Sequence, residues 1–559
     1  MAHSTVATHE PAARPPLTPT VGVFLCRCAT GWRPGFDDAI ARWLERWAHD
    51  LVVIVRHDLC RAPHRVARLR AHAELRGAVI SACAEQAGLA PLLRRVGIWP
   101  WAIESVDLSA MAELAGGTVH VERQLAAAVA RVRALLRAGP EHLKVTYGPQ
   151  GERCERRALL RFLLEPAYQV VPAVDRAQCL AARGCGLCLD VCPARALRGE
   201  SGSVAVQQEA CTACGACVTA CPAHAITRPG LELVDLDAQL EALLAPREGS
   251  PAPPRLILTC AGQGQMPPHP RQDTGMAPAA GVVLALPCAA SISPALLLRA
   301  FERGARSVAM LGCAGVCPQG LDRTRIRRTV GFATQVLAAL GLGDRRLALV
   351  EGPGEEGGSA APLPCPEASM RTPPGIEGQT RDGPPTNLQD LSLPAILGRL
   401  RAACGSATVD VIAGEDVPFG QVQVHGERPC TLCGVCIQIC PTQALGLVQD
   451  VSSEALTFAH ARCVGCGLCV EQCPETIVRL DRALDLSDLD SRPRVLARAE
   501  VICCRHCQQP IAPASMLAKV QGALCSLPQG RLWDLHELCP SCRLAKSVGS
   551  HADASAGKA

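Results

Sequence analysis

Four runs of four cysteines, each closed by a proline, restrict the fold of this 559-residue chain more than any other feature. Three runs have the spacing C-x2-C-x2-C-x3-C-P, and one has five residues instead of two in its first gap. Three thiolates from one tight loop can wrap a corner of a cubane cluster, whereas the fourth cannot reach from that loop and ligates the partner cluster. The spacing therefore predicts four 4Fe–4S clusters, held as two pairs.

The expected ligand sets follow from this crossed arrangement. In the first pair, one cluster is expected on Cys179, Cys185, Cys188 and Cys221, and the other on Cys211, Cys214, Cys217 and Cys192. In the second pair, one is expected on Cys430, Cys433, Cys436 and Cys473, and the other on Cys463, Cys466, Cys469 and Cys440. Glycines inside the runs let the backbone approach a cluster and direct its amides at the sulfurs.

Structural zinc or unmetallated thiols are the alternative for these runs. Zinc knuckles use pairs of cysteines rather than runs of four closed by proline, so a cluster fits the pattern better. After the last cysteine the chain continues as Cys-Pro-x-x-Ala-Leu/Ile at Ala196–Leu197, Ala225–Ile226 and Ala444–Leu445. In these motifs it resembles the bacterial two-cluster ferredoxin family, from which the five-residue gap after Cys179 departs.

The 33 cysteines and the absence of an export signal point to a reducing compartment. An odd count in a large chain is not typical of a disulfide scaffold. Residues 1–20 are polar and Pro-rich, so a disordered tail is expected there rather than a secretory signal. No run of 18 apolar residues occurs, so no membrane span is expected. The predicted location is the cytoplasm, and the net charge of +4 implies no strong attraction to nucleic acid or membranes.

Two further regions, 21–140 and 255–345, alternate short apolar runs with amphipathic stretches, as βα units around a parallel sheet do. A helix is expected over Val119–Leu136. The expected strands are Val21–Leu25, Leu51–Val55, Ala78–Ser81, Leu256–Leu258, Val282–Leu286 and Ser307–Leu311.

The predicted fold is multidomain, α/β plus α+β. Two Rossmann- or flavodoxin-like α/β regions alternate with two ferredoxin-like dicluster modules, at 175–230 and 426–480. Residues 231–254 and 352–390 are expected to be linkers, the second disordered because it is rich in Gly, Pro, Ser and Glu. Residues 500–545 are expected to form a small zinc-ribbon-like segment.

Cysteines also follow the expected strands, where open parallel sheets gather functional groups. They are Cys26, Cys28, Cys60 and Cys83 in the first α/β region, and Cys260, Cys288, Cys313 and Cys317 in the second. Each set can hold a further iron–sulfur cluster. Buried free cysteines are the alternative.

Two resemblances bear on these strand-end sites. The stretch Val21-Gly-Val-Phe-Leu-Cys-Arg-Cys28, with Cys60 and Ser81-Ala-Cys83, resembles the N-terminal domain of the heterodisulfide reductase A subunit. The stretches Leu286-Pro-Cys288, 294–305 and Leu311-Gly-Cys313 resemble the delta subunit of F420-non-reducing hydrogenase. The resemblances imply iron–sulfur sites in both regions. The hydrogenase delta subunit carries a 2Fe–2S cluster, and either a 2Fe–2S or a further 4Fe–4S cluster is expected in this chain. The second region departs from its family by having only Cys260 near the first strand and Cys317 one residue closer to Cys313.

No flavin is expected, although the reductase A subunit carries FAD on a Gly-rich βαβ unit. The G-x-G-x-x-G sequence here is Gly352, Gly354 and Gly357. It runs into Gly-Ser-Ala-Ala-Pro-Leu-Pro, which cannot form the helix whose N-terminus would hold a pyrophosphate.

Two C-terminal knuckles, Cys504-Arg-His-Cys507 and Cys539-Pro-Ser-Cys542, together predict a four-thiolate zinc site. A further iron centre or unmetallated thiols are the alternatives. Cys154, Cys365 and Cys404 are isolated and are expected to be ordinary thiols.

The leading function is electron relay inside a larger oxidoreductase, with no catalytic residue in this chain. The resemblances imply catalytic partner subunits of hydrogenase, formate dehydrogenase or heterodisulfide reductase type. One alternative is a self-contained, heterodisulfide reductase-like oxidoreductase that uses a strand-end site. The other is a regulatory zinc and iron–sulfur protein that binds nucleic acid. The scarcity of aromatics and the lack of a basic cluster near the knuckles argue against the second alternative.

Overall fold

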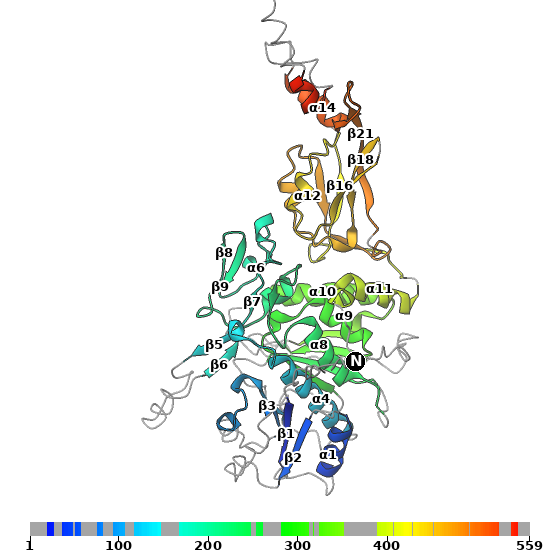
Figure 1. Cartoon of the computed structure of the whole chain (residues 1–559). Coiled ribbons are helices and arrows are strands. Elements are labelled where there is room, and N and C mark those ends of the chain that lie inside the picture. The colour runs from blue at the N-terminus through cyan, green and yellow to red at the C-terminus, as the bar shows by residue number, and fades with distance from the viewer. Residues whose placement is uncertain are drawn as a thin grey trace, which may run out of the picture. The chain divides into compact units, whose positions relative to one another are not determined.

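The computed structural model describes a large part of the chain, shown in Figure 1. The described residues are 20–26, 36–47, 51–56, 75–81, 93–106, 117–146, 167–247, 253–260, 281–311, 317, 323–350, 388–405, 407–426, 429–450, 452–490, 492–524 and 538–545. They belong to two compact units. The first comprises 1–170, 235–254 and 263–285, and the second comprises 171–234, 255–262 and 286–559.

The first α/β region is built on four parallel strands in the order β2-β1-β3-β4. Val21, Val23 and Leu25 of β1 lie in one buried core with helices α1 and α4, and Phe24 lies in a second core on the opposite face. Because both faces are buried, β1 has a continuous apolar sequence. The elements are β1 (Thr20–Cys26), α1 (Phe36–Trp47), β2 (Leu51–Arg56), β3 (Leu75–Ser81), β4 (Ile103–Val106) and α4 (Gly117–Leu135), followed by the antiparallel pair β5 (Leu143–Thr146) and β6 (Ala167–Val170).

The second α/β region has the same strand order relative to the chain, β12-β11-β13-β14, and β11, β13 and β14 are parallel. Its elements are β11 (Arg255–Cys260), β12 (Gly281–Leu286), α9 (Pro294–Glu302), β13 (Ser307–Leu311), α10 (Arg323–Ala339), β14 (Leu347–Val350) and α11 (Leu393–Cys404). The strands expected in both regions are confirmed, and α4 matches the expected helix to within two residues at each end.

Residues 231–254, expected to be a linker, contain helix α8 (Leu233–Leu244). Leu236, Leu240 and Leu243 recur at helical spacing and are buried. Arg123 of α4 donates a hydrogen bond to the carbonyl oxygen of Leu243 at 2.8 Å. This buried contact ties the end of α8 to α4.

The two cysteine-rich modules share one plan. In each, a cysteine loop leads into a short helix, an antiparallel hairpin separates the two motifs, and a second antiparallel pair joins the start of the module to its end. The first contains β7 (Ala173–Val174), α6 (Leu187–Asp190), β8 (Leu197–Glu200), β9 (Ser203–Val206), α7 (Ala216–Ala220) and β10 (Ile226–Thr227). The second contains β15 (Val411–Ala413), β16 (Gln421–Val424), α12 (Val435–Ile439), β17 (Leu445–Gln449), β18 (Ser453–Phe458), α13 (Leu468–Glu471), β19 (Val478–Asp481) and β20 (Ala483–Asp485).

The hairpin of the second module is extended into a four-stranded sheet, β17-β18-β21-β22. The added elements are β21 (Arg494–Cys503) and β22 (Pro510–Pro513), and helix α14 (Ala514–Leu524) follows them. Strand β21 of this extension leads from the second module to the first C-terminal knuckle.

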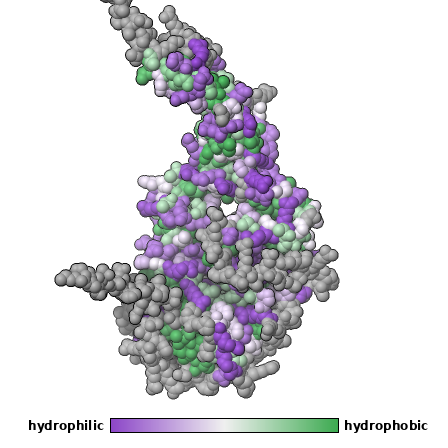
Figure 2. All heavy atoms as spheres, turned by 45° about the vertical axis from the view of Figure 1, so that its right-hand side comes forward, coloured by the Kyte–Doolittle hydropathy of each residue, from purple (hydrophilic) through white to green (hydrophobic). Residues whose placement is uncertain are grey.

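None of the helices in the described part of the chain combines the length and apolar character that a membrane span requires. Figure 2 shows hydrophilic and hydrophobic residues interspersed over much of the coloured part of the visible face. The fold observed is thus a mixed α/β architecture with two modules of ferredoxin-like plan.

The close packing of α4 on β3 generates a prediction. A Cβ atom added at Gly77 of β3 would lie 2.4 Å from Cγ1 of the buried Val132. We expect Gly77→Ala to destabilise this region by about 1–3 kcal/mol through overpacking. Hydrogen exchange of the β3 and α4 amides would measure the loss. Gly331→Ala in α10, where an added Cβ meets no atom within 4 Å, is the matched control and should cause no loss of protection. Equal protection in both variants would contradict the packing described here.

Candidate metal centres

Two open cavities in the first cysteine-rich module are each lined by four thiols. One cavity is lined by Cys179, Cys185, Cys188 and Cys221. The other is lined by Cys192, Cys211, Cys214 and Cys217. Each cavity combines three cysteines of one motif with the last cysteine of the other. The structure therefore brings together the same residues as the two expected ligand sets of this module.

Burial makes these thiols hard to ionise. Burial and the neighbouring thiols, Cys221 first among them, raise the pKa of Cys188 to about 11. Burial also raises the pKa of Cys217 strongly, and the adjacent Cys214 and Cys211 add to the effect. Four thiolates can share such a cavity when cations lie between them. The donor sets thus fit a cluster of iron ions bound by thiolates.

The second module repeats this arrangement. Burial raises the pKa of Cys436 to about 12, and the thiols that contribute next are Cys430, Cys433 and Cys473. Burial likewise raises the pKa of Cys469 to about 12, followed by contributions from Cys463, Cys466 and Cys440. The crossed grouping again matches the expected ligand sets.

Left-handed backbone turns follow the last cysteine of each run, and in three of the runs the next amide donates to that cysteine. The third residue after that cysteine has a positive φ in all four runs, between 48° and 55°: Arg195, His224, Gln443 and Thr476. The next amide then donates to the cysteine Sγ, from Ala196 to Cys192 at 3.2 Å, from Ala225 to Cys221 at 3.3 Å and from Ala444 to Cys440 at 3.2 Å. Such bonds stabilise a thiolate ligand and tune its cluster. The cysteine spacing does not predict a role for these four residues, although the Cys-Pro-x-x-Ala pattern marks their positions.

The five-residue gap after Cys179 is accommodated within the cysteine loop itself. Ala181–Arg183 form a single 3-10 turn, and Gly184 follows it with a φ of 84°. The residue before the second cysteine also has a positive φ in the other three runs, at Ala213, Leu432 and Gly465. The longer loop therefore ends in the same backbone turn as the shorter ones, and Cys179 still lines the cavity.

Of the strand-end cysteines in the second α/β region, the structure brings two together. Cys260 forms a hydrogen bond with Cys288, and this bond, followed by burial, raises the pKa of Cys288 strongly. Both lie in a small core cluster with Cys214 of the first module. Cys317 is half-buried, and Cys313 lies outside the described residues.

The corresponding site in the first α/β region is described only by the backbone of Cys26, which ends β1. Cys28, Cys60 and Cys83 lie outside the described residues, as do Gly352, Gly354 and Gly357. A cluster in this region stays a prediction.

Comparison with protein families agrees with the geometry of the modules. Residues 172–222 and 429–477 each match a 4Fe-4S dicluster domain family. The chain contains two 4Fe–4S dicluster domains. Residues 274–362 match the family described as the delta subunit of methyl-viologen-reducing hydrogenase. No curated protein sequence matches the chain. The resemblances to ferredoxins and to a hydrogenase delta subunit are thereby confirmed, and they support a role in iron–sulfur electron transfer.

Beyond the second dicluster domain, the four C-terminal thiols converge. The ligand atoms of Cys504, Cys507, Cys539 and Cys542 all lie within 4.8 Å of one another. Four sulfurs bound tetrahedrally at about 2.3 Å from a zinc ion lie about 3.8 Å apart, so the group is of the right size for one ion. A hydrogen bond from the amide of Cys539 is the main cause that lowers the pKa of Cys504, which favours its thiolate form as a metal ligand.

The crossed cavities of the first dicluster domain predict paired phenotypes. Cys192→Ala should remove the same cluster as Cys217→Ala, and Cys221→Ala should remove the same cluster as Cys188→Ala. Each change should lower the iron content by about four atoms per chain. Mössbauer and EPR spectra of the four variants would show the pairing. If Cys192→Ala instead matched Cys188→Ala, ligation would follow the motifs and not cross between them.

Proposed function

We propose that this chain is an electron-transfer subunit that carries four 4Fe–4S clusters on the sixteen cysteines of its two dicluster domains. The observation that carries the proposal is the pair of cavities in the first domain, each lined by four thiols from two crossed motifs. A cubane bound there accepts and donates single electrons. The protein contributes the ligands, the amide hydrogen bonds to sulfur and the apolar surroundings that set the potential. Electron relay requires no protein acid or base at these sites.

The partners proposed are catalytic subunits of a redox complex, of hydrogenase, formate dehydrogenase or heterodisulfide reductase type. Support comes from the match of residues 274–362 to a hydrogenase delta subunit, a name that itself denotes a component of a larger enzyme. The close thiols of Cys260 and Cys288 offer ligands for a further iron–sulfur centre in that region. We also infer that the two α/β regions are of Rossmann or flavodoxin type, because both have the strand order 2-1-3-4.

We further propose that the C-terminal thiols bind one structural zinc ion. Their close spacing favours a single ion over a cubane, and the buried Cys504 and Cys539 pack with Leu538 in a small core. The ion would join the knuckle that follows β21 to the knuckle at 539–542, because it would bind two cysteines of each. Helix α14 ends at Leu524, before the second knuckle begins.

The relay function predicts how the isolated protein behaves. Anaerobically purified protein should contain about 16 iron atoms per chain, or about 20 or more if the strand-end sites are filled. Dithionite should reduce it, whereas NADH, H2 and formate should not, because hydride chemistry needs a flavin or a similar cofactor. Adding the correct catalytic subunit should bleach the visible absorption with the substrate of that subunit. Turnover of any of these substrates by the pure chain would show that it is an enzyme in its own right.

The zinc site predicts a separate metal count. Wild-type protein should contain about one zinc ion, which the double change Cys504→Ala and Cys542→Ala should remove while leaving the iron content unchanged. Cys503→Ala is the matched control, because this exposed neighbour of Cys504 lies outside the group of four thiols. Elemental analysis of the three proteins would decide. Iron in place of zinc at this site would refute the assignment.

A further inference from the structure

Helix α10 contacts the loops of both dicluster domains, and both domains belong to the second compact unit. At its start, Arg325 donates a hydrogen bond at 3.5 Å to the carbonyl oxygen of Ala216, which lies between two cysteines of the first domain. Two turns further on, the ring of Phe332 lies 6.5 Å from the ring of Phe419. The ring of Phe419 in turn lies 5.7 Å from the tilted ring of the buried His460, three residues before Cys463. One helix therefore positions a cysteine loop of each domain.

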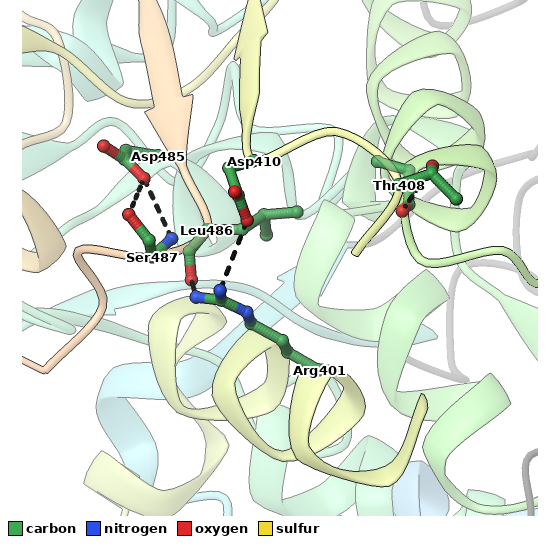
Figure 3. A network of polar contacts seen from close by, with 7 residues as sticks. Arg401, Thr408, Asp410, Asp485, Leu486 and Ser487 are labelled. Atoms are coloured by element: carbon green, nitrogen blue, oxygen red, sulfur yellow. Dashed lines mark hydrogen bonds and ion pairs between the residues drawn. The ribbon is translucent and has the colours of Figure 1, made fainter. Parts of the chain in front are cut away.

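The segment that leads into the second domain is fixed at further points. Thr408 donates a hydrogen bond from its Oγ1 to the carbonyl oxygen of Ala339, at the end of α10, at 2.9 Å (Figure 3). Arg401 of α11 pairs with Asp410 at 3.2 Å and donates to the carbonyl oxygen of Leu486 (Figure 3). These contacts hold the start and the end of the second domain against the helices of the second α/β region.

So held, the two domains meet beside their cysteines. A Cβ atom added at Gly184 would lie 4.0 Å from Cγ1 of Ile439. Gly184 immediately precedes Cys185, and Ile439 immediately precedes Cys440. The set that contains Cys185 thus faces the set that contains Cys440.

The remaining neighbour relations between the cysteine sets lie within each domain and beside the second α/β region. Within the first domain, Cys188 of one set and Cys217 of the other lie in the same core cluster. Beyond that second set, Cys214 lies in a buried cluster with Cys288 and its neighbour Cys260. In the second domain, Cys436 of one set packs against the core cluster that contains Cys469 of the other. Each set of four cysteines therefore lies next to one or two other sets.

From this juxtaposition we propose that the four clusters form a single unbranched chain that crosses between the domains at Gly184 and Ile439. The order is the set of Cys430, the set of Cys463, the set of Cys179 and the set of Cys211, which lies beside Cys260 and Cys288 of the second α/β region. Each step moves one electron, so that one cluster is oxidised as its neighbour is reduced, and redox partners supply and remove electrons at the two ends. The proposal rests on the proposed function and adds the order and the place where the domains connect. It makes the face around Ile439 an internal junction and places the ends at the set of Cys430 and at the second α/β region.

The first test measures magnetic coupling. The double variant Cys217→Ala with Cys436→Ala keeps only the two sets that face each other across the junction. Its EPR spectrum after dithionite reduction should show spin–spin broadening or splitting. The matched control, Cys188→Ala with Cys469→Ala, keeps only the two outer sets and should give the sum of two isolated signals. Each variant should retain about eight iron atoms. Iron retained without coupling in the first variant, or equal coupling in both, would overturn the order. Wild-type protein without iron would instead refute the proposed function.

A second test does not depend on clusters. A photo-crosslinking benzophenone amino acid replaces Ile439 in the full chain, and mass spectrometry identifies the peptides captured. We expect capture of the segment 180–187 of the first dicluster domain. The same probe at Val435, an exposed residue of α12, is the control and should capture that segment at a far lower yield. Equal or absent capture from position 439 would show that the domains do not meet there.

Discussion

Ionising several buried thiols close to one another costs free energy, and the rest of the structure depends on how that cost is offset. Cys217 lies among Cys214, Cys211 and Cys192, and its burial strongly opposes ionisation. Four thiolates can remain in such a cavity when positive charge is placed between them, which is what a cluster of iron ions supplies. The dicluster domains are therefore small folds built around their clustered cysteines, with apolar side chains such as Val204 and Ile226 completing the shell.

The backbone around each cavity serves the same requirement. Arg195, His224, Gln443 and Thr476 adopt left-handed conformations that cost free energy in residues other than glycine. The amides that follow the first three donate hydrogen bonds to cysteine sulfur. The cost is offset where the thiol acts as a thiolate, because a hydrogen bond to a charged group is worth more than one to a neutral group. The same amides are means by which the protein sets the potential of a cluster.

The second α/β region has a structural role beside any redox role. Arg325 and Phe332 of α10 contact the cysteine-bearing loop of one domain and the segment beside a loop of the other. Cys288, beyond the end of β12, lies in a core cluster with Cys214. The region that matches a hydrogenase delta subunit thus contacts the first dicluster domain beside one of its cavities. It contacts the second domain at the segment that leads into that domain. A relay needs this arrangement, because electron tunnelling falls off steeply with distance.

The sequence by itself determined the features that depend on local spacing. These are the crossed pairing of cysteine runs, as in Cys192 with Cys217, and the strands, whose burial on both faces leaves continuous apolar runs. It did not reveal α8 as part of the packing of α4, nor the left-handed residues. That Cys507 and Cys539, 32 positions apart in the sequence, converge and that Gly184 faces Ile439 follows from the tertiary structure. These contacts depend on how distant segments pack, and a spacing rule carries no information about side chains from elements that are far apart in the chain.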